Sequence, residues 1–185
     1  ELRLNQQTID LNDSGQRISP HDPLLPLFLA LPMGLGGWLA SKIALAVLAA
    51  LTAVVTLWVA VRRFNVSTNI ATAVVAVLFA SPPMTSYATQ IYPKMPAALA
   101  LITSIAIITG ATTRKAVFAL ILALTALPWL SVKYVPVTAA LAAYFLYKNW
   151  NNERKKTYFF SVVMGISAIA YLIIHKRIYG GWTVY

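Results

Sequence analysis

The sequence has no cysteine and few acidic residues, with five Asp and Glu against 15 Lys and Arg. Without cysteine the chain forms no disulfide and has no thiol chemistry, although this does not identify its compartment. Because histidine also occurs only twice, the sequence contains no Cys/His set with metal-ligand spacing. The glycine-rich residues 34–37 (GLGG) do not follow a predicted strand, which excludes a dinucleotide-binding fingerprint.

Apolar residues dominate the composition instead. They make up 59% of the 185 residues, whereas charged residues make up 11%, and the mean hydropathy is +0.69. A soluble domain of this length cannot bury so much apolar surface, so lipid is the expected solvent. The net charge of +10 is distributed over several short loops. It lacks the fold signature of a nucleic-acid-binding protein, so we expect no nucleic-acid partner.

Six apolar segments predict an all-α fold, a polytopic transmembrane helix bundle with about six spans. The segments cover residues 38–61, 66–80, 96–109, 116–127, 134–147 and 157–174. The first is long enough to cross a hydrocarbon core of about 30 Å. Several others are shorter than the roughly 20 residues of a full span. Residues 116–147 therefore have a re-entrant hairpin as an alternative to two spans.

The N-terminal part differs from the rest of the chain. Residues 1–20 are polar and predict a solvated loop. Pro23 can begin a short helix, which Pro32 and the following glycines end. We expect residues 1–37 to be an outward-facing loop with a short interfacial helix. Residues 38–174 then form a transmembrane helical domain, and residues 175–185 begin a following outer segment. The chain begins with Glu1 and shows no signal peptide, so we also expect a preceding segment with a membrane anchor.

Alternation of the segments divides the basic residues into two groups. One group occupies compact loops and consists of Arg62, Arg63, Arg114, Lys115, Lys148, Arg154, Lys155 and Lys156. The positive-inside rule assigns such loops to the cytoplasm. The other group consists of Arg3, Arg17, Lys42, Lys94, Lys133, Lys176 and Arg177. Topology does not account for these outer cations, so they are candidates for a function.

Two intervals rich in proline and aromatic residues, 81–96 and 127–136, separate apolar segments, and each contains one lysine. We expect both intervals at the outer membrane face, where they help to build one site. Lys94 and Lys133 either extend to the lipid headgroups or bind the phosphate of a lipid-linked ligand.

Aromatic side chains accompany both lysines. Tyr92, Trp129 and Tyr134 either pack on the face of a sugar or belong to the aromatic belt of a membrane protein. Gln90 lies in the first interval beside Tyr92 and completes the set of candidate substrate-binding residues.

His21 and Asp22 form the only histidine–carboxylate dipeptide of the sequence. They are candidates for a metal ligand or for an acid–base pair. The alternative, which we slightly favour, is that Asp22 caps the short helix after Pro23.

Four stretches, in order, resemble the GT-C superfamily of membrane glycosyltransferases. Residues 21–32 (HDPLLPLFLALP) resemble the segment after its first outer loop, and residues 89–98 (TQIYPKMPAA) resemble its Tyr-Pro-Glu-x-Pro-Ala-Ala stretch. Residues 127–134 (LPWLSVKY) resemble its Leu-Pro-Trp-Leu-x-x-Arg/Lys-Tyr stretch, and residues 178–182 (IYGGW) are similar to its Tyr-Gly-Ser/Asp turn.

The resemblance implies a polyprenyl-phosphate-dependent glycosyltransferase, mannosyltransferase- or aminoarabinose-transferase-like, or a fragment of one. Such an enzyme transfers a sugar by inverting displacement at the outer face of a multi-pass membrane domain, here in a bacterial plasma (inner) membrane. It implies membrane lipid, a lipid-linked sugar donor and possible membrane protein partners, and a divalent metal as a possible cofactor. The implied substrate-binding residues are His21, Gln90, Tyr92, Lys94, Trp129, Lys133 and Tyr134; Asp22 is the catalytic candidate, and His21 and Asp22 are the metal-ligand candidates.

Two departures from the family pattern matter. The acidic pair of the first outer loop has no match and would lie before Glu1, and Lys94 stands where an acidic residue is common. We therefore expect residues 1–185 alone to be inactive. One alternative is a non-catalytic GT-C-like subunit with a structural or assembly role. A transporter or flippase is a further alternative, although the apolar segments lack the mid-helix ionisable residues typical of ion coupling.

Overall fold

A computed structural model describes residues 9–11, 16–18, 22–179 and 181–182 of the chain. Near the N-terminus β1 (Ile9–Leu11) pairs with β2 (Gln16–Ile18) in an antiparallel hairpin. The predicted solvated loop is therefore wrong at these positions. The register pairs Ile9 with Ile18, Asp10 with Arg17 and Leu11 with Gln16.

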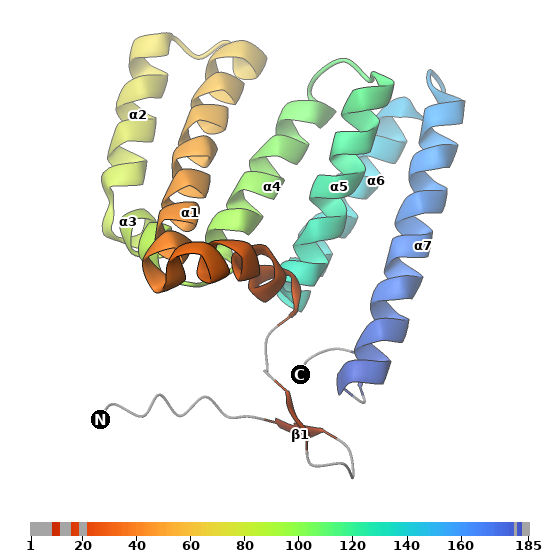
Figure 1. Cartoon of the computed structure of the whole chain (residues 1–185). Coiled ribbons are helices and arrows are strands. Elements are labelled where there is room, and N and C mark those ends of the chain that lie inside the picture. The colour runs from red at the N-terminus through yellow and green to blue at the C-terminus, as the bar shows by residue number, and fades with distance from the viewer. Residues whose placement is uncertain (1–8, 12–15, 19–21, 180, 183–185) are drawn as a thin grey trace.

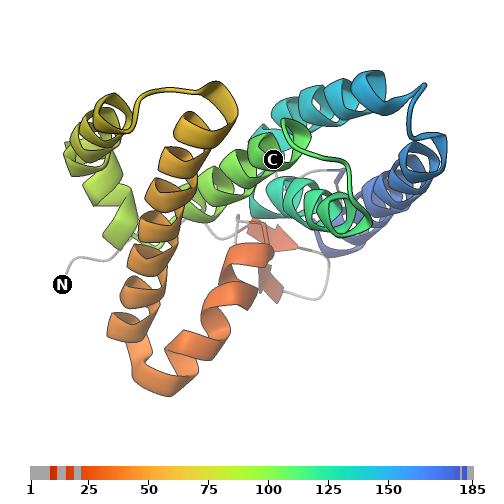
Figure 2. The ribbon, with the colours of Figure 1, turned by 90° about the horizontal axis from the view of Figure 1, so that it is seen from above.

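The first helix, α1 (Leu24–Phe64), consists of two legs that meet at a kink. The backbone leaves the helical region at Gly36 (φ −149°, ψ 21°) and Gly37 (φ 62°, ψ −149°). The conformation of Gly37 is one that glycine alone adopts readily. The first leg lies at the lower end of the helices in Figure 1, and seen from above it diverges from the second leg in a V (Figure 2). The short helix after Pro23 and its glycine break are confirmed, but the helix continues through Pro32 instead of ending there.

The remaining helices are α2 (Thr68–Ala80), α3 (Pro82–Thr89), α4 (Lys94–Ile108), α5 (Arg114–Leu130), the 3₁₀ helix η1 (Val132–Tyr134), α6 (Val135–Asn149) and α7 (Arg154–Tyr179). Each predicted apolar segment thus forms a helix, and α7 continues beyond the expected end at residue 174. The prolines of residues 81–96 separate α2, α3 and α4, as their missing N–H groups predict.

Helix length does not support the prediction of six complete spans. Among the described residues, α1 with 41 residues and α7 with 26 are long and apolar enough to cross a membrane, and α2 with α3 adds a third only if this pair, bent by 62°, is one span. Helices α4, α5 and α6 have 15, 17 and 15 residues, whereas a span needs about 20. The chain is a helical protein with two such helices, or up to three.

Helix α5 forms the centre of the core. Its buried residues include Val117, Leu120, Ile121, Leu124 and Leu127, a spacing that places them along one face of the helix. The faces of α1 and α7 that point away from the core instead expose many large apolar side chains. Exposed apolar surface on this scale is typical of helices solvated by lipid.

The loops gather at two opposite ends of the helices (Figure 1). One end consists of residues 62–67, 109–115 and 148–156; we call it the basic end. Contacts across it join distant segments, because Nζ of Lys148 donates to the carbonyl oxygen of Ile108 at 2.6 Å. The first leg of α1, α3, the α3–α4 link and η1 form the other end, which we call the cavity end. Lys94 and Lys133 thus lie in elements opposite the basic loops, as the alternation predicts.

Candidate functional site

A cavity of about 490 Å³ opens at the cavity end. The first leg of α1 supplies one wall, the α3–α4 link a second and the α5–η1 junction a third. Most of the lining is apolar, with contributions from Leu25, Leu29, Met33, Ile91 and Leu130. An apolar cavity with a few polar groups at its edge is the usual form of a small-molecule site.

Three of the candidate residues, Asp22, Tyr92 and Lys133, line this cavity, together with Ser131. Lys94, Trp129 and Tyr134 are not part of the lining. The two proline-rich intervals therefore meet at one place, as predicted. Gln90 lies apart from the lining, since it is exposed at the C-terminal end of α3. His21 lies outside the described residues.

Tyr92 lies between the two lysines of the site. Nζ of Lys94 is 5.7 Å from the centre of the Tyr92 ring and Nζ of Lys133 is 5.3 Å from it. Lys133 also lies 5.6 Å from the Tyr134 ring, and Lys94 lies 3.9 Å from the Tyr87 ring and donates to its hydroxyl. Each cation–π contact contributes about 0.5–1 kcal/mol at an exposed site. The aromatic rings thus hold two positive charges near one another beside the cavity.

Tyr134 belongs to η1, outside the helices that are long enough to span a membrane. Partial burial raises the pKa of its hydroxyl, and Tyr92 and Tyr87 raise it further. The hydroxyl therefore remains protonated near neutral pH and keeps a hydrogen atom to donate to an anion.

Asp22 holds three elements together from a buried position. The backbone N–H of Val132 donates to its Oδ2 at 3.1 Å, and the Tyr171 hydroxyl donates to its Oδ1 at 3.3 Å. Nε2 of His175 lies 2.9 Å from the same Oδ1. The interpretation of Asp22 as a helix cap is wrong, because α1 has Pro23 at its N-cap and no side-chain cap. Its oxygens bind η1 and α7 instead of the first turn of α1.

Both ring nitrogens of His175 have oxygen partners. Its Nδ1 lies 2.9 Å from the carbonyl oxygen of Tyr171, and its Nε2 lies against Oδ1 of Asp22. The side chains of His175 and Asp22 are 0% and 3% exposed, so this pair is buried.

Trp129 stands behind the cavity wall. Its ring centroid lies 5.3 Å from that of Tyr171, edge to face, and 5.5 Å from that of His175. It is therefore placed to pack against the buried ion pair, and it is absent from the cavity lining.

Sequence reasoning missed His175 and Tyr171. Tyr171, His175 and Tyr179 recur every four residues, which places them on one face of α7. A histidine within such a stripe could have predicted a buried polar contact, because ionisable groups in apolar helices are usually paired.

Within the part of the chain that is described, no three His, Asp or Glu side chains are grouped to hold a metal ion. The Asp22 carboxylate instead contacts the N–H of Val132, the hydroxyl of Tyr171 and Nε2 of His175.

Comparison of the chain with family models, with curated proteins and with solved structures gave no match.

Proposed function

We propose that this protein is a membrane glycosyltransferase of the GT-C type, or part of one, that binds the phosphate of a polyprenyl-phosphate-linked sugar at the cavity end. One observation carries the proposal: Lys133 and Tyr92 line an apolar cavity of about 490 Å³, and Nζ of Lys94 also lies within 5.7 Å of the Tyr92 ring centre. A lipid phosphate needs both features, because its chain requires apolar surface and its head requires cations.

The same groups suit the chemistry of sugar transfer. When the bond to the anomeric carbon breaks, the lipid phosphate leaves with additional negative charge. The ammonium of Lys133 would stabilise that charge where it develops, and Lys94 would add to it across the Tyr92 ring. Tyr92 also offers a ring face on which a sugar can pack.

Asp22 is the carboxylate with a described side chain at this cavity. A role of Asp22 as general base stays a prediction; its carboxylate already has three partners, one on Oδ2 and two on Oδ1. Its contacts support a positioning role in the proposal. By fixing the N–H of Val132, Asp22 fixes the segment that carries Lys133.

The proposal includes a finer topology. The second leg of α1 and helices α2, α4, α5, α6 and α7 lie side by side (Figure 1), which supports six membrane-embedded segments. We place the basic end in the cytoplasm and the protein in a bacterial plasma membrane.

A second candidate function is a non-catalytic subunit that binds lipid phosphate in the same cavity. The specific observation in its favour is that both oxygens of Asp22 already have donors. Both functions require binding of a lipid phosphate, but only the glycosyltransferase also transfers the sugar.

The test is binding of a short-chain polyprenyl phosphate to the purified protein in detergent. We expect Lys133→Ala to weaken binding roughly 10- to 150-fold, which corresponds to about 1.5–3 kcal/mol for hydrogen bonds to a charged group. Lys133→Arg should retain most of the affinity because the positive charge remains. Lys176→Ala is the matched control, since this exposed lysine contacts the Trp182 ring away from the cavity.

Equal losses for Lys133→Ala and Lys176→Ala would contradict the phosphate site. Sugar transfer separates the two functions when it is measured on the complete natural protein, because residues 1–185 alone are expected to be inactive. Turnover that Lys133→Ala abolishes supports the enzyme, whereas phosphate binding without turnover supports the non-catalytic subunit.

A further inference from the structure

We propose that the basic end carries a second site, which binds an anionic phospholipid between α5 and α7. A cavity of about 590 Å³ lies there. Three cations line it, Arg114 at the start of α5 and Lys155 and Lys156 at the start of α7, with Glu153 as the single carboxylate. This site is separate from the cavity at the other end and does not depend on the proposed glycosyl transfer.

The cavity changes from polar to apolar along the helices. Val117, Phe118 and Phe159 complete its lining, and the two phenylalanine rings are 59% and 53% exposed. They follow the cations along α5 and α7, so the apolar wall begins within about one turn of the charged rim. Helix α7 is itself long and apolar enough to span a membrane. The cations at its first turn therefore lie at the depth of headgroups, and the rings at the depth of acyl chains.

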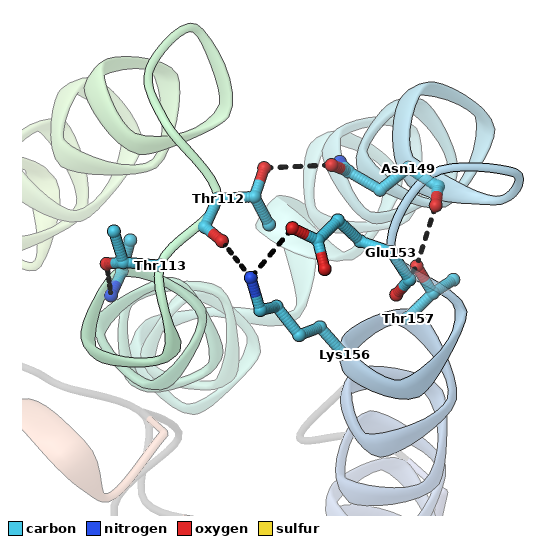
Figure 3. Close-up of polar contacts among 7 residues, drawn as sticks. Thr112, Thr113, Asn149, Glu153, Lys156 and Thr157 are labelled. Atoms are coloured by element: carbon cyan, nitrogen blue, oxygen red, sulfur yellow. Dashed lines mark hydrogen bonds and ion pairs between the residues drawn. The ribbon is translucent and has the colours of Figure 1, made fainter.

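The cavity wall is fixed by hydrogen bonds between segments (Figure 3). Nζ of Lys156 donates to the carbonyl oxygen of Thr112 at 2.5 Å and lies 2.8 Å from Oε1 of Glu153. The Thr112 hydroxyl donates to Oδ1 of Asn149 at 2.8 Å, and the Thr157 hydroxyl donates to the carbonyl oxygen of Asn149. These bonds attach the start of α7 to the α4–α5 loop, so the two helices hold the cavity open at a set separation.

These hydrogen bonds also determine which of the three lining cations can bind a ligand. Nζ of Lys156 is already bound to the carboxylate of Glu153 and to the carbonyl oxygen of Thr112. Arg114 and Lys155 are exposed and make no ion pair or side-chain hydrogen bond within the described part of the chain. A guanidinium can bind two phosphate oxygens at once, and an ammonium adds a point charge.

This combination selects one class of ligand. A zwitterionic lipid provides the chains without the net negative charge, and a free phosphate provides the charge without the chains. An anionic phospholipid, for example phosphatidylglycerol, provides both. Basic pockets between membrane helices on the cytoplasmic side are suited to such headgroups.

The experiment compares binding of phosphatidylglycerol and phosphatidylcholine to the purified chain in detergent. We expect phosphatidylglycerol to bind more tightly, and Arg114→Gln with Lys155→Gln to weaken its binding about 30-fold, or about 5-fold for each cation removed. The control is Arg62→Gln, which removes an exposed charge at the same end that does not line this cavity. Glycerol phosphate, which has no chains, should not displace the lipid.

Three outcomes would overturn the site. One is equal binding of the two lipids, a second is a loss in Arg62→Gln as large as in the double variant, and a third is displacement by glycerol phosphate. Unfolding curves of each variant, measured by circular dichroism, must match that of the parent protein, because the substituted side chains make no bonds that hold the fold. If the double variant is destabilised relative to Arg62→Gln, the assignment of both side chains as free ligand groups is wrong.

Discussion

At the residue scale, the ion pair of Asp22 and His175 joins two side chains that are 153 positions apart in the chain. It joins the start of α1 to the end of α7, and the N–H of Val132 adds the α5–η1 junction. Both side chains are almost fully buried. Loss of either partner removes the contact of opposite sign from the other, although Asp22 keeps the N–H of Val132 and the hydroxyl of Tyr171 as donors.

We expect His175→Ala to lower the free energy of unfolding by about 3–5 kcal/mol, the usual result of removing one partner of a buried pair. Asp22→Asn with His175→Ala should be less destabilised than the sum of the single variants, because the orphaned charge is gone. Denaturant unfolding in detergent measures both. Lys176→Ala, at the exposed neighbouring position, is the control. A His175→Ala protein as stable as the Lys176→Ala protein would show that the pair contributes little.

At the element scale, the kink of α1 determines where the cavity wall lies. The first leg supplies Leu25, Leu29 and Met33 to the lining, and its direction is set at Gly36 and Gly37. The Cβ of an alanine at position 36 would come within 2.8 Å of Cβ of Ala40, and φ at Gly37 is +62°. Side chains are therefore disfavoured at both positions, for a steric reason at the first and a backbone reason at the second.

Gly37→Ala should destabilise the protein by about 1–3 kcal/mol, the cost of a strained backbone conformation. It should also weaken polyprenyl-phosphate binding, because the first leg would lose its direction. Gly34→Ala is the matched control: it lies in the helical leg, has open space around it, and should be neutral or slightly stabilising. Thermal unfolding and the binding assay together check this prediction. Equal behaviour of the two variants would mean that the kink tolerates an ordinary residue.

Local pattern explains which elements could be predicted from sequence. Apolar runs separated by proline, glycine and basic residues placed the helices α2, α4, α5, α6 and α7 near their observed positions, whereas α3 forms inside an interval for which no helix was predicted. Continuation of α1 through Pro32 could not be read from the residue type, since packing of the first leg offsets the lost hydrogen bond. The meeting of Lys94, Tyr92 and Lys133 followed from alternation of the helices. The partnership of Asp22 with His175 did not, because it depends on tertiary packing of positions that share no local pattern.

At the scale of the whole molecule, the charges divide between two ends, and each end has its own cavity. The absence of cysteine makes the orientation of these ends measurable, because any introduced thiol is unique. Ser67 and Asn151 lie in loops of the basic end, and Ser86 lies in α3 at the cavity end. All three side chains are exposed.

An impermeant thiol reagent applied to intact cells should label Ser86→Cys and leave Ser67→Cys and Asn151→Cys unlabelled until the membrane is opened. The physical reason is that compact basic loops are retained in the cytoplasm. The reverse pattern would invert the proposed topology. Labelling of Ser67→Cys without Asn151→Cys would show that the loops of the basic end do not share one side.

The carboxylate of Asp22 also has a consequence for the order of biosynthesis. Its partner His175 follows 153 positions later in the chain, so helices α1 to α6 are synthesised before that partner exists. Until α7 has been made, Asp22 lacks two of its three observed partners, Tyr171 and His175. A nascent chain that stops short of α7 therefore keeps only the contact of Asp22 with the N–H of Val132.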